Sequence, residues 1–470
     1  MKFTILAFLG LVFSSSIFAQ SSEDLEHYSA LYPDAQLVGI KHIDETDIKI
    51  GKEGIEVLER SYVEDFYLSS NSSLFADKSI SYGFWTEIKS IDAYTMVPNG
   101  DKYKKKKVDD FKVKDEFTSG IFYDDRKSTN FYLPSLQKGA KSVVDYTRAV
   151  GSPYLTSSAY FGSFYPVEYM EFVVRCDEGV KITWKEFHME NVKVDFTTTV
   201  EKGRTIYKWT CSNIPRIIDE QFAPNLAYYA PHIIVYINSY EFKGENKLVL
   251  NDVGDLYRWY ISMVKDVNKE DNENLRQLTD SLTLGAKSDR EKVEAIFYWT
   301  QDNIKYVAVE AGLGGLIPRE AAYVCEKRYG DCKDMASIIT EMCKYAGVET
   351  HMTWIGSRDI PYTYEEMPAP VVDNHMIATY IDGDDIIFLD ATGKRHPFGT
   401  PTAFIQGKQA LIRISDDDYR LAKVPPVAAA NNQRHESITM RIDDGTVMGQ
   451  SKTILSGYYR GLYLDYYHYT

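Results

Sequence analysis

Cys332 stands where the sequence predicts the start of a helix, a position that favours nucleophilic chemistry. Gly330 is expected to allow a tight turn before it. Asp331 is a good N-cap because its carboxylate can accept from free amides of the first turn, and Asp334 occupies the acidic position of a capping box. Apolar side chains then recur at helical spacing, at Met335, Ile338, Ile339, Met342 and Ala346. Free amides and the positive end of the helix dipole stabilise a thiolate there, and the thiolate is the reactive form of cysteine.

A histidine and an aspartate downstream are placed to assist this cysteine. Two β-rich runs flank Asp382-Gly383, which is a strong hairpin signal. With these two residues as the turn, His375 falls directly opposite Asp390 on one face of the hairpin, with β-carbons about 4.5–5.5 Å apart. At that separation a carboxylate can fix the tautomer and orientation of an imidazole. The pattern therefore predicts a Cys-His-Asp set.

The other cysteines point to structural roles. Cys343 lies almost three helical turns after Cys332 and is expected on the same buried face as a small hydrophobe. The total of five is odd, so at least one thiol stays free, and Cys176 and Cys211 are equally compatible with a disulfide or with two buried thiols. No zinc-type spacing of Cys or His occurs, and we expect neither a metal nor a cofactor.

With these residues in place, the stretch 288–398 resembles the transglutaminase-like core, a branch of the papain-like cysteine enzymes. The matching pieces are Asp302-Asn303-Ile304-Lys305-Tyr306, Pro318-Arg319, Tyr329-Gly330-Asp331-Cys332-Lys333-Asp334, Asn374-His375 and Leu389-Asp390-Ala391-Thr392. The resemblance implies that Cys332 is the nucleophile, His375 the general base and acid, and Asp390 the orienting carboxylate. In such enzymes an upstream side chain often shares the oxyanion site with the amide of the nucleophile, and Tyr306 is the candidate for that role.

The rest of the chain predicts an α+β protein of several domains. Residues 20–251 read as many short strands, which favours a large antiparallel β-sandwich, and they resemble the β-rich domain of unknown function that precedes such cores in secreted bacterial proteins. Helical signals begin near residue 252, and the catalytic domain is expected at 252–410. Residues 411–470 read as a linker and the start of a C-terminal β domain. The glycine-rich run 311–315 lacks a phosphate-binding motif and is interpreted as a mobile loop near the cleft.

Charge and the N-terminal segment narrow the class of function. The net charge of −15 argues against a nucleic-acid partner, because phosphate binding needs a basic face. Residues 1–19 resemble a secretion signal, with an apolar run too short to span a bilayer. No cysteine stands near the cleavage point for lipid attachment, since the first is Cys176. The protein is expected to be periplasmic or secreted and without a membrane span.

The chemistry expected is acyl transfer on an amide bond of a peptide or protein substrate, through a cysteine acyl-enzyme. Resolution by water would make the protein a peptidase or amidase, whereas resolution by an amine would make it a protein-crosslinking transglutaminase. Hydrolysis is the default because water is abundant. A non-catalytic module that binds peptide or glycan is the alternative of another class. Neither the substrate nor the oligomeric state follows from the sequence.

Overall fold

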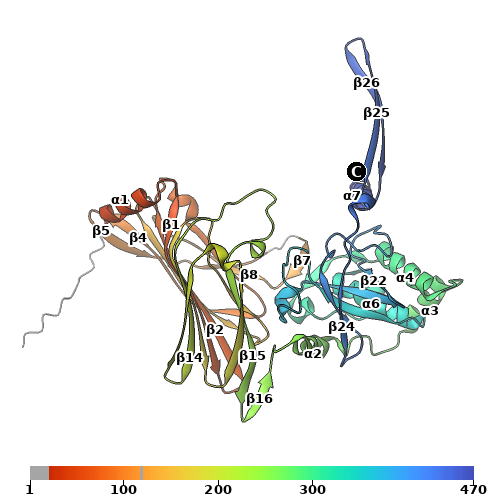
Figure 1. The fold of residues 1–470 in the computed structure, drawn as a ribbon, viewed down its shortest axis with the longest axis horizontal. Helices are drawn as coiled ribbons and strands as arrows, with labels where there is room; N and C mark the ends of the chain where they lie inside the picture. The colour runs from red at the N-terminus through yellow and green to blue at the C-terminus, as the bar shows by residue number, and fades with distance from the viewer. Residues whose placement is uncertain (1–20, 117–119, 470) are drawn as a thin grey trace, which may run out of the picture.

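The computed structural model describes residues 21–116 and 120–469, arranged as an N-terminal β domain, an α+β core and a C-terminal extension (Figure 1). The predicted secretion signal at residues 1–19 lies outside the described residues and stays a prediction. Among the described residues, no helix is long and apolar enough to cross a membrane.

The N-terminal domain is built on an eight-stranded sheet packed against smaller sheets. A short helix, α1 (Ser21–Leu31), precedes it. The large sheet has the order β13 (Val194–Glu201), β14 (Arg204–Ile214), β11 (Val167–Asp177), β1 (Leu37–Ile50), β2 (Ile55–Tyr67), β9 (Lys141–Val150), β4 (Thr86–Asn99) and β5 (Lys102–Lys107). A second sheet contains β10 (Ser157–Tyr160), β15 (His232–Phe242), β12 (Val180–Phe187) and β16 (Glu245–Leu248), and a third contains β3 (Asp77–Tyr82), β8 (Lys127–Tyr132) and β6 (Lys112–Asp115). Neighbouring strands of the large sheet run antiparallel except β1 and β11, which are parallel.

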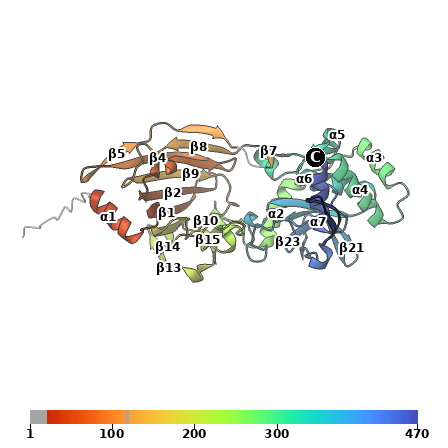
Figure 2. The ribbon, with the colours of Figure 1, turned by 90° about the horizontal axis from the view of Figure 1, so that it is seen from above.

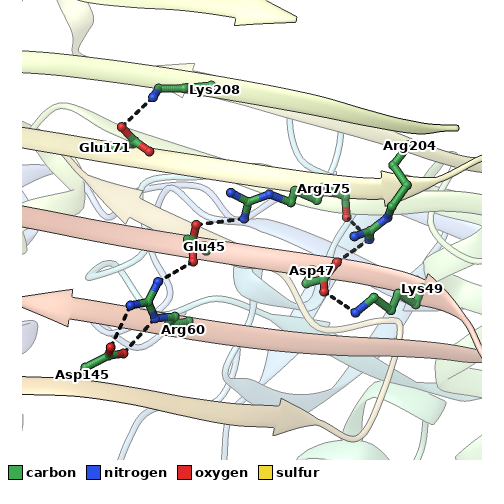
Figure 3. A network of polar contacts seen from close by, with 9 residues as sticks. All are labelled: Glu45, Asp47, Lys49, Arg60, Asp145, Glu171, Arg175, Arg204 and Lys208. Carbon is green, nitrogen blue, oxygen red and sulfur yellow. Dashed lines mark hydrogen bonds and ion pairs between the residues drawn. The ribbon is translucent and has the colours of Figure 1, made fainter. Parts of the chain in front are cut away.

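One face of the large sheet carries a ladder of ion pairs, which Figure 3 shows across neighbouring strands. Arg60 bridges Glu45 and Asp145, at 3.0 and 2.7 Å, and Arg175 pairs with Glu45 at 2.9 Å. Glu45 and Ile48 both belong to β1, and alternation along the strand places Ile48 on the opposite face of the sheet, where it is 2% exposed. These charges neutralise one another, so this face reads as a solvated surface.

The core combines helices with a five-stranded sheet of order β22 (Asp385–Leu389), β21 (His375–Asp382), β20 (Thr350–Ile355), β23 (Gln409–Arg413) and β24 (Tyr419–Lys423). The helices are α2 (Val253–Val264), α3 (Glu273–Thr283), α4 (Asp289–Asn303), α5 (Ala321–Lys327) and α6 (Cys332–Tyr345). Short pieces lie between them, at β17 (Lys305–Tyr306), β18 (Ala308–Glu310), η4 (Gly312–Gly315) and β19 (Tyr329–Gly330). Helix α6 is the buried centre, because Ile338, Ile339 and Met342 are each 0% exposed.

A continuous hydrophobic cluster joins the N-terminal domain to the core. It includes Trp209 of the large sheet, Ile233 of the second sheet, Tyr260 of α2 and Trp354 of β20. The rings of Tyr260 and Trp354 stack at 5.0 Å between centroids. The two domains therefore share apolar packing and are not connected by a linker alone. The α+β class and the order of a large N-terminal sheet domain followed by the core are confirmed.

Two expectations for the C-terminal part need correction. The core does not end at residue 410, because β23 and β24 extend its sheet to Lys423 through antiparallel pairing with β20. The hairpin of β25 (Arg434–Asp443) and β26 (Thr446–Leu455) projects away from both domains (Figure 1). Residues 411–470 were expected to contain a linker and the start of a β domain, but their Tyr-rich end forms helix α7 (Tyr458–Tyr469), since apolar rings at irregular spacing fit either element.

Candidate active site

The first turn of α6 has the predicted capping box. The Asp331 carboxylate accepts from the amides of Lys333 and Asp334, at 3.0 and 3.4 Å. In return, the Asp334 carboxylate accepts from the Asp331 amide at 3.0 Å. Gly330 is needed for close approach rather than for an unusual backbone angle, because a β-carbon there would lie 2.5 Å from that of Asp334. Cys332 is thereby fixed at the tip of a packed helix, 8% exposed.

Lys333 has a partner that the sequence did not indicate. Helical geometry alone indicates only that the Lys333 side chain turns about 100° away from Cys332. Its ammonium is buried, 5% exposed as a residue, and pairs with the Asp331 carboxylate at 2.8 Å. Burial alone would lower the pKa of Lys333, but the negative charges of Cys332 and Asp331 raise it. The Asp331 carboxylate thus accepts hydrogen bonds from the helix amides and also pairs with the buried ammonium of Lys333.

Replacing Asp331 with alanine is therefore expected to cost more than a lost helix cap. A cap alone contributes about 1 kcal/mol, whereas leaving a buried charge without its partner costs about 3 kcal/mol or more. The measurement is the free energy of unfolding in urea. Ser288→Ala is the matched control, because Ser288 caps α4 through the Glu291 amide and carries no buried cation. Equal losses in the two variants would contradict the role given to Lys333.

The hairpin that carries His375 and Asp390 forms in a different register from the one expected. The turn is Gly383-Asp384 rather than Asp382-Gly383. Gly383 has φ +60° and takes the first turn position, where a type II′ turn favours glycine. Continuing this register puts Ile377, not His375, opposite Asp390. His375 is the diagonal neighbour two residues away, so both side chains remain on one face, within reach of each other.

His375 and Asp390 form a buried ion pair. The distance from His375 Nε2 to Asp390 Oδ2 is 3.3 Å, and the residues are 9% and 2% exposed. Nε2 makes no hydrogen bond of good angle within the described part of the chain, so the attraction is mainly between charges. Burial alone would lower the pKa of His375, but the Asp390 carboxylate and contact with Cys332 raise it to about 10. Burial disfavours the Asp390 carboxylate, yet His375 and neighbouring hydroxyls hold its pKa well below the usual range.

Three side chains hold this pair in place; the sequence analysis included Thr392 in a motif without assigning it a role, and it missed Thr402 and Phe404. Thr392 donates to Asp390 Oδ1 through its hydroxyl at 2.6 Å, and Thr402 donates to Oδ2 at 2.7 Å. The ring of Phe404 packs edge-on against the imidazole of His375, with centroids 5.2 Å apart. Thr392 follows Asp390 closely enough to belong to the motif, whereas Thr402 and Phe404 come from a loop without a recognisable signal.

A second buried carboxylate, Asp373, lies two residues before His375. Both Tyr260 and Tyr364 donate to its Oδ2 at 2.8 Å. Burial raises the pKa of Asp373 to about 7, although the two phenols counteract it. These contacts tie α2 and the loop before β21 to the strand end that presents His375.

Tyr306 lies beside the cysteine, as the motif suggested. Its backbone pairs with Gly330 in a short parallel ladder, two residues before Cys332. Burial raises the pKa of its phenol, and the negative charge of Cys332 is the next cause. Tyr306 is 40% exposed. The oxyanion role remains a proposal.

The structure also answers two questions that the sequence left open, whether the cysteines are bridged and whether side chains cluster around a metal site. All five cysteines, which lie within the described ranges, are free thiols, so Cys176 and Cys211 are not bridged. Burial raises the pKa of both Cys176 and Cys343 to about 12, which makes these thiols poor nucleophiles. Within residues 21–116 and 120–469, no cluster of three or more His, Cys, Asp or Glu side chains is arranged to hold a metal ion.

Comparison with known proteins agrees with this division of the chain. Residues 276–380 match the model of the transglutaminase-like superfamily, and residues 68–218 match that of DUF3857, a domain of unknown function. The chain therefore carries a transglutaminase-like core behind a DUF3857 domain, and the resemblance inferred from the motifs is confirmed.

Solved structures give a fold match at low identity. The crystal structure of a candidate protease from Parabacteroides distasonis superposes with a TM-score of 0.62 at 14% identity, covering 86% of this chain and 77% of that chain. A candidate cysteine protease from Cytophaga hutchinsonii matches with a TM-score of 0.22 at 14% identity, over 51% of this chain and 79% of that chain. At such identities the first likeness supports the fold alone. No curated protein matches the chain.

Proposed function

We propose that the protein is a cysteine-nucleophile enzyme that transfers acyl groups from amide bonds, acting as a peptidase or amidase on peptide or protein substrates. The observation that carries the proposal is the buried His375–Asp390 pair, and Cys332 at the helix tip also contributes to the raised pKa of His375. A buried charged pair of this kind costs stability unless it is well compensated, and such groups with shifted pKa values gather at functional sites. The candidate protease from Parabacteroides distasonis, which shares the fold, is consistent with this class.

Each residue has a role in the proposed reaction. His375 takes the proton from the thiol of Cys332, and Asp390 holds the imidazole by its Nε2 edge and stabilises the imidazolium. The thiolate attacks the amide carbonyl, and the carbonyl oxygen becomes an oxyanion. When the tetrahedral intermediate collapses, the C–N bond breaks, His375 protonates the leaving amine, and a thioester remains on Cys332. Water, activated by His375, then hydrolyses the thioester to a carboxylic acid.

The amide of Cys332 is the first donor proposed for the oxyanion. The Asp331 carboxylate accepts from the two following amides, at Lys333 and Asp334, and leaves the Cys332 amide available. The Tyr306 hydroxyl is proposed as the second donor, since its strand pairs with Gly330. One such donor typically contributes about 3 kcal/mol to the transition state.

Site-resolved alkylation tests the proposal. At a pH of about 6 an ordinary thiol, with a pKa of about 8.5, is almost wholly protonated and reacts slowly with iodoacetamide. Cys332 is expected to be labelled selectively there, because His375 and the helix tip stabilise its thiolate. His375→Ala should remove this acid-range labelling, whereas Cys325→Ala on α5 should leave it unchanged. Cys332 reacting no faster than Cys325 would contradict the proposal. A second assay adds a primary amine to a peptide that the protein cleaves. The products then show whether water or the amine resolves the thioester.

A further inference from the structure

A cavity of about 1060 Å³ lies beside the residues that hold His375 in place. Asp390, Thr402 and Phe404 form its wall nearest the candidate site. The half-exposed ring of Phe404 also packs edge-on against the imidazole of His375. The cavity therefore begins one side chain away from the proposed general base. Its volume is that of a large ligand-binding cavity, since about 300–1,000 Å³ is typical.

Three parts of the chain enclose this cavity. The N-terminal domain contributes Tyr228 at the end of the short helix η3 (Leu226–Tyr228). The core contributes residues 358–359, which follow β20, and parts of the loop 392–406, which follows β22. Helix α7 contributes Leu462, and Figures 1 and 2 both show this helix over the core. A molecule in the cavity would therefore contact residues of both domains and of the C-terminal extension.

The backbone of Arg358 is fixed in the wall of the cavity from two sides. Its amide donates to the carbonyl oxygen of Phe404 at 2.9 Å, and its carbonyl oxygen accepts from the Tyr228 hydroxyl at 2.5 Å. The Arg358 side chain is exposed, and it makes no hydrogen bond, ion pair or ring contact with any residue that the structure describes. The backbone is thus held in place while the guanidinium remains available to a ligand.

A second cation, Lys394, lines the same cavity. It is exposed and likewise forms no ion pair within residues 21–116 and 120–469. Acidic side chains outnumber basic ones in the chain, 68 to 53, so these two cations do not lack partners for want of acids. The lining contains two carboxylates. Asp390 is engaged by His375 and two hydroxyls, and Asp359 forms no ion pair with Arg358 in the described structure.

We propose that this cavity binds a carboxylate of the polypeptide substrate, with Arg358 as the main contact and Lys394 as the second. This inference rests on the proposed function of Cys332. A guanidinium can hold a carboxylate through two parallel hydrogen bonds, and a lysine adds a point charge. Because an extended chain advances about 3.3 Å per residue, the carboxylate belongs to a residue a few positions from the scissile amide. An acidic side chain and the C-terminus of a peptide both supply this group.

Matched peptides, tested on the full chain, detect this recognition. In each peptide a single Glu replaces Gln at successive positions on either side of the scissile amide. With the unaltered protein, KM is expected to be about tenfold lower for Glu at one position or two neighbouring positions, the lower end of the effect of a hydrogen bond to a charged group. Peptides with a free or an amidated C-terminus identify the source. A preference that follows Glu assigns an acidic side chain, whereas one that follows the free acid assigns the end of the substrate.

Substitutions of Arg358 then locate the recognition. Arg358→Gln should remove most of the preference, and its backbone contacts to Phe404 and Tyr228 do not depend on the side chain. Arg358→Glu should reverse the preference, so that a peptide with Lys at the same position has a lower KM than one with Glu. The matched control is Arg420→Gln, which changes an exposed arginine of β24 outside the cavity lining and alters the net charge equally. This control should keep the preference.

Three results would overturn the proposal. The first is a KM that is the same for Glu and Gln at every position and for free and amidated C-termini. The second is an equal loss of preference in Arg358→Gln and Arg420→Gln, because the preference would then reflect the net charge of the protein. The third is loss of the acid-range labelling of Cys332 in Arg358→Gln, which would make Arg358 a support of the site. Failure of the proposed function itself would appear separately, as absent Cys332 labelling in the unaltered protein.

Discussion

Replacing Cys332 with alanine is expected to abolish amide hydrolysis, lowering kcat by about 10⁶-fold, the scale seen when a covalent nucleophile is removed from an intact site. No thioester can form without the sulfur, and His375 and Asp390 alone cannot replace it. The measurements are kcat on a fluorogenic peptide and the intact mass of the trapped acyl-enzyme, which should be present only in the unaltered protein.

The fold should survive this substitution. Alanine at position 332 removes one sulfur atom and leaves the contacts of Asp331 and Asp334 in place, so the free energy of unfolding should change by about 1 kcal/mol or less. Cys325→Ala is the control for losing a thiol elsewhere and should retain full activity. Hydrolysis at an undiminished rate in Cys332→Ala would assign the chemistry to another residue and refute the proposed mechanism.

The features that the sequence predicted correctly depend on local signals. The capping box at Asp331 and Asp334 is a contact within one helical turn, so residue types and spacing are enough to identify it. The face shared by His375 and Asp390 also followed from sequence, because alternation along a strand fixes the face even when the register changes by two. The turn itself was assigned wrongly, since Gly383 fits the second position of one turn type and the first position of another.

What the sequence did not reveal comes from distant parts of the chain. Thr402 reaches Asp390 from a loop twelve residues away in sequence, and Asp125 meets Gly312 across 187 residues. Strand β7 (Ile121–Asp124) has only four residues, too few for a sequence pattern that would predict which strand it pairs with. Nothing in its composition shows that it pairs with β18 of the core. The burial of Lys333 was missed for a related reason, because helical geometry gives direction but not what covers the side chain.

Asp390→Asn is expected to lower kcat by about 10⁴-fold, the scale known for neutralising the carboxylate behind a catalytic histidine. Asparagine has nearly the same shape and can still accept from Thr392, so the fold should hold. The effect is electrostatic: the Asp390 charge helps to raise the pKa of His375 to about 10, and without it only Cys332 opposes the lowering of that pKa by burial. Below its pKa His375 is the imidazolium that stabilises the thiolate. In the variant, the acid-range labelling of Cys332 should therefore shift to higher pH.

Thr402→Val provides the graded control for this prediction, because it removes one hydrogen bond to Asp390 Oδ2 and keeps the charge. A hydrogen bond from a neutral donor to a charged group contributes about 1.5–3 kcal/mol. Without it the Asp390 carboxylate can shift, and a loss of that size corresponds to a decrease in activity on the order of tenfold to a hundredfold. The order of activities should be unaltered protein, then Thr402→Val, then Asp390→Asn. The pH at which Cys332 becomes reactive should rise in Asp390→Asn but not in Thr402→Val, because only the first substitution removes the charge beside His375. If Asp390→Asn retained both its activity and its labelling at a pH of about 6, the thiolate would owe its stability to the tip of α6 alone, and His375 would lose its proposed role as the base that Asp390 orients.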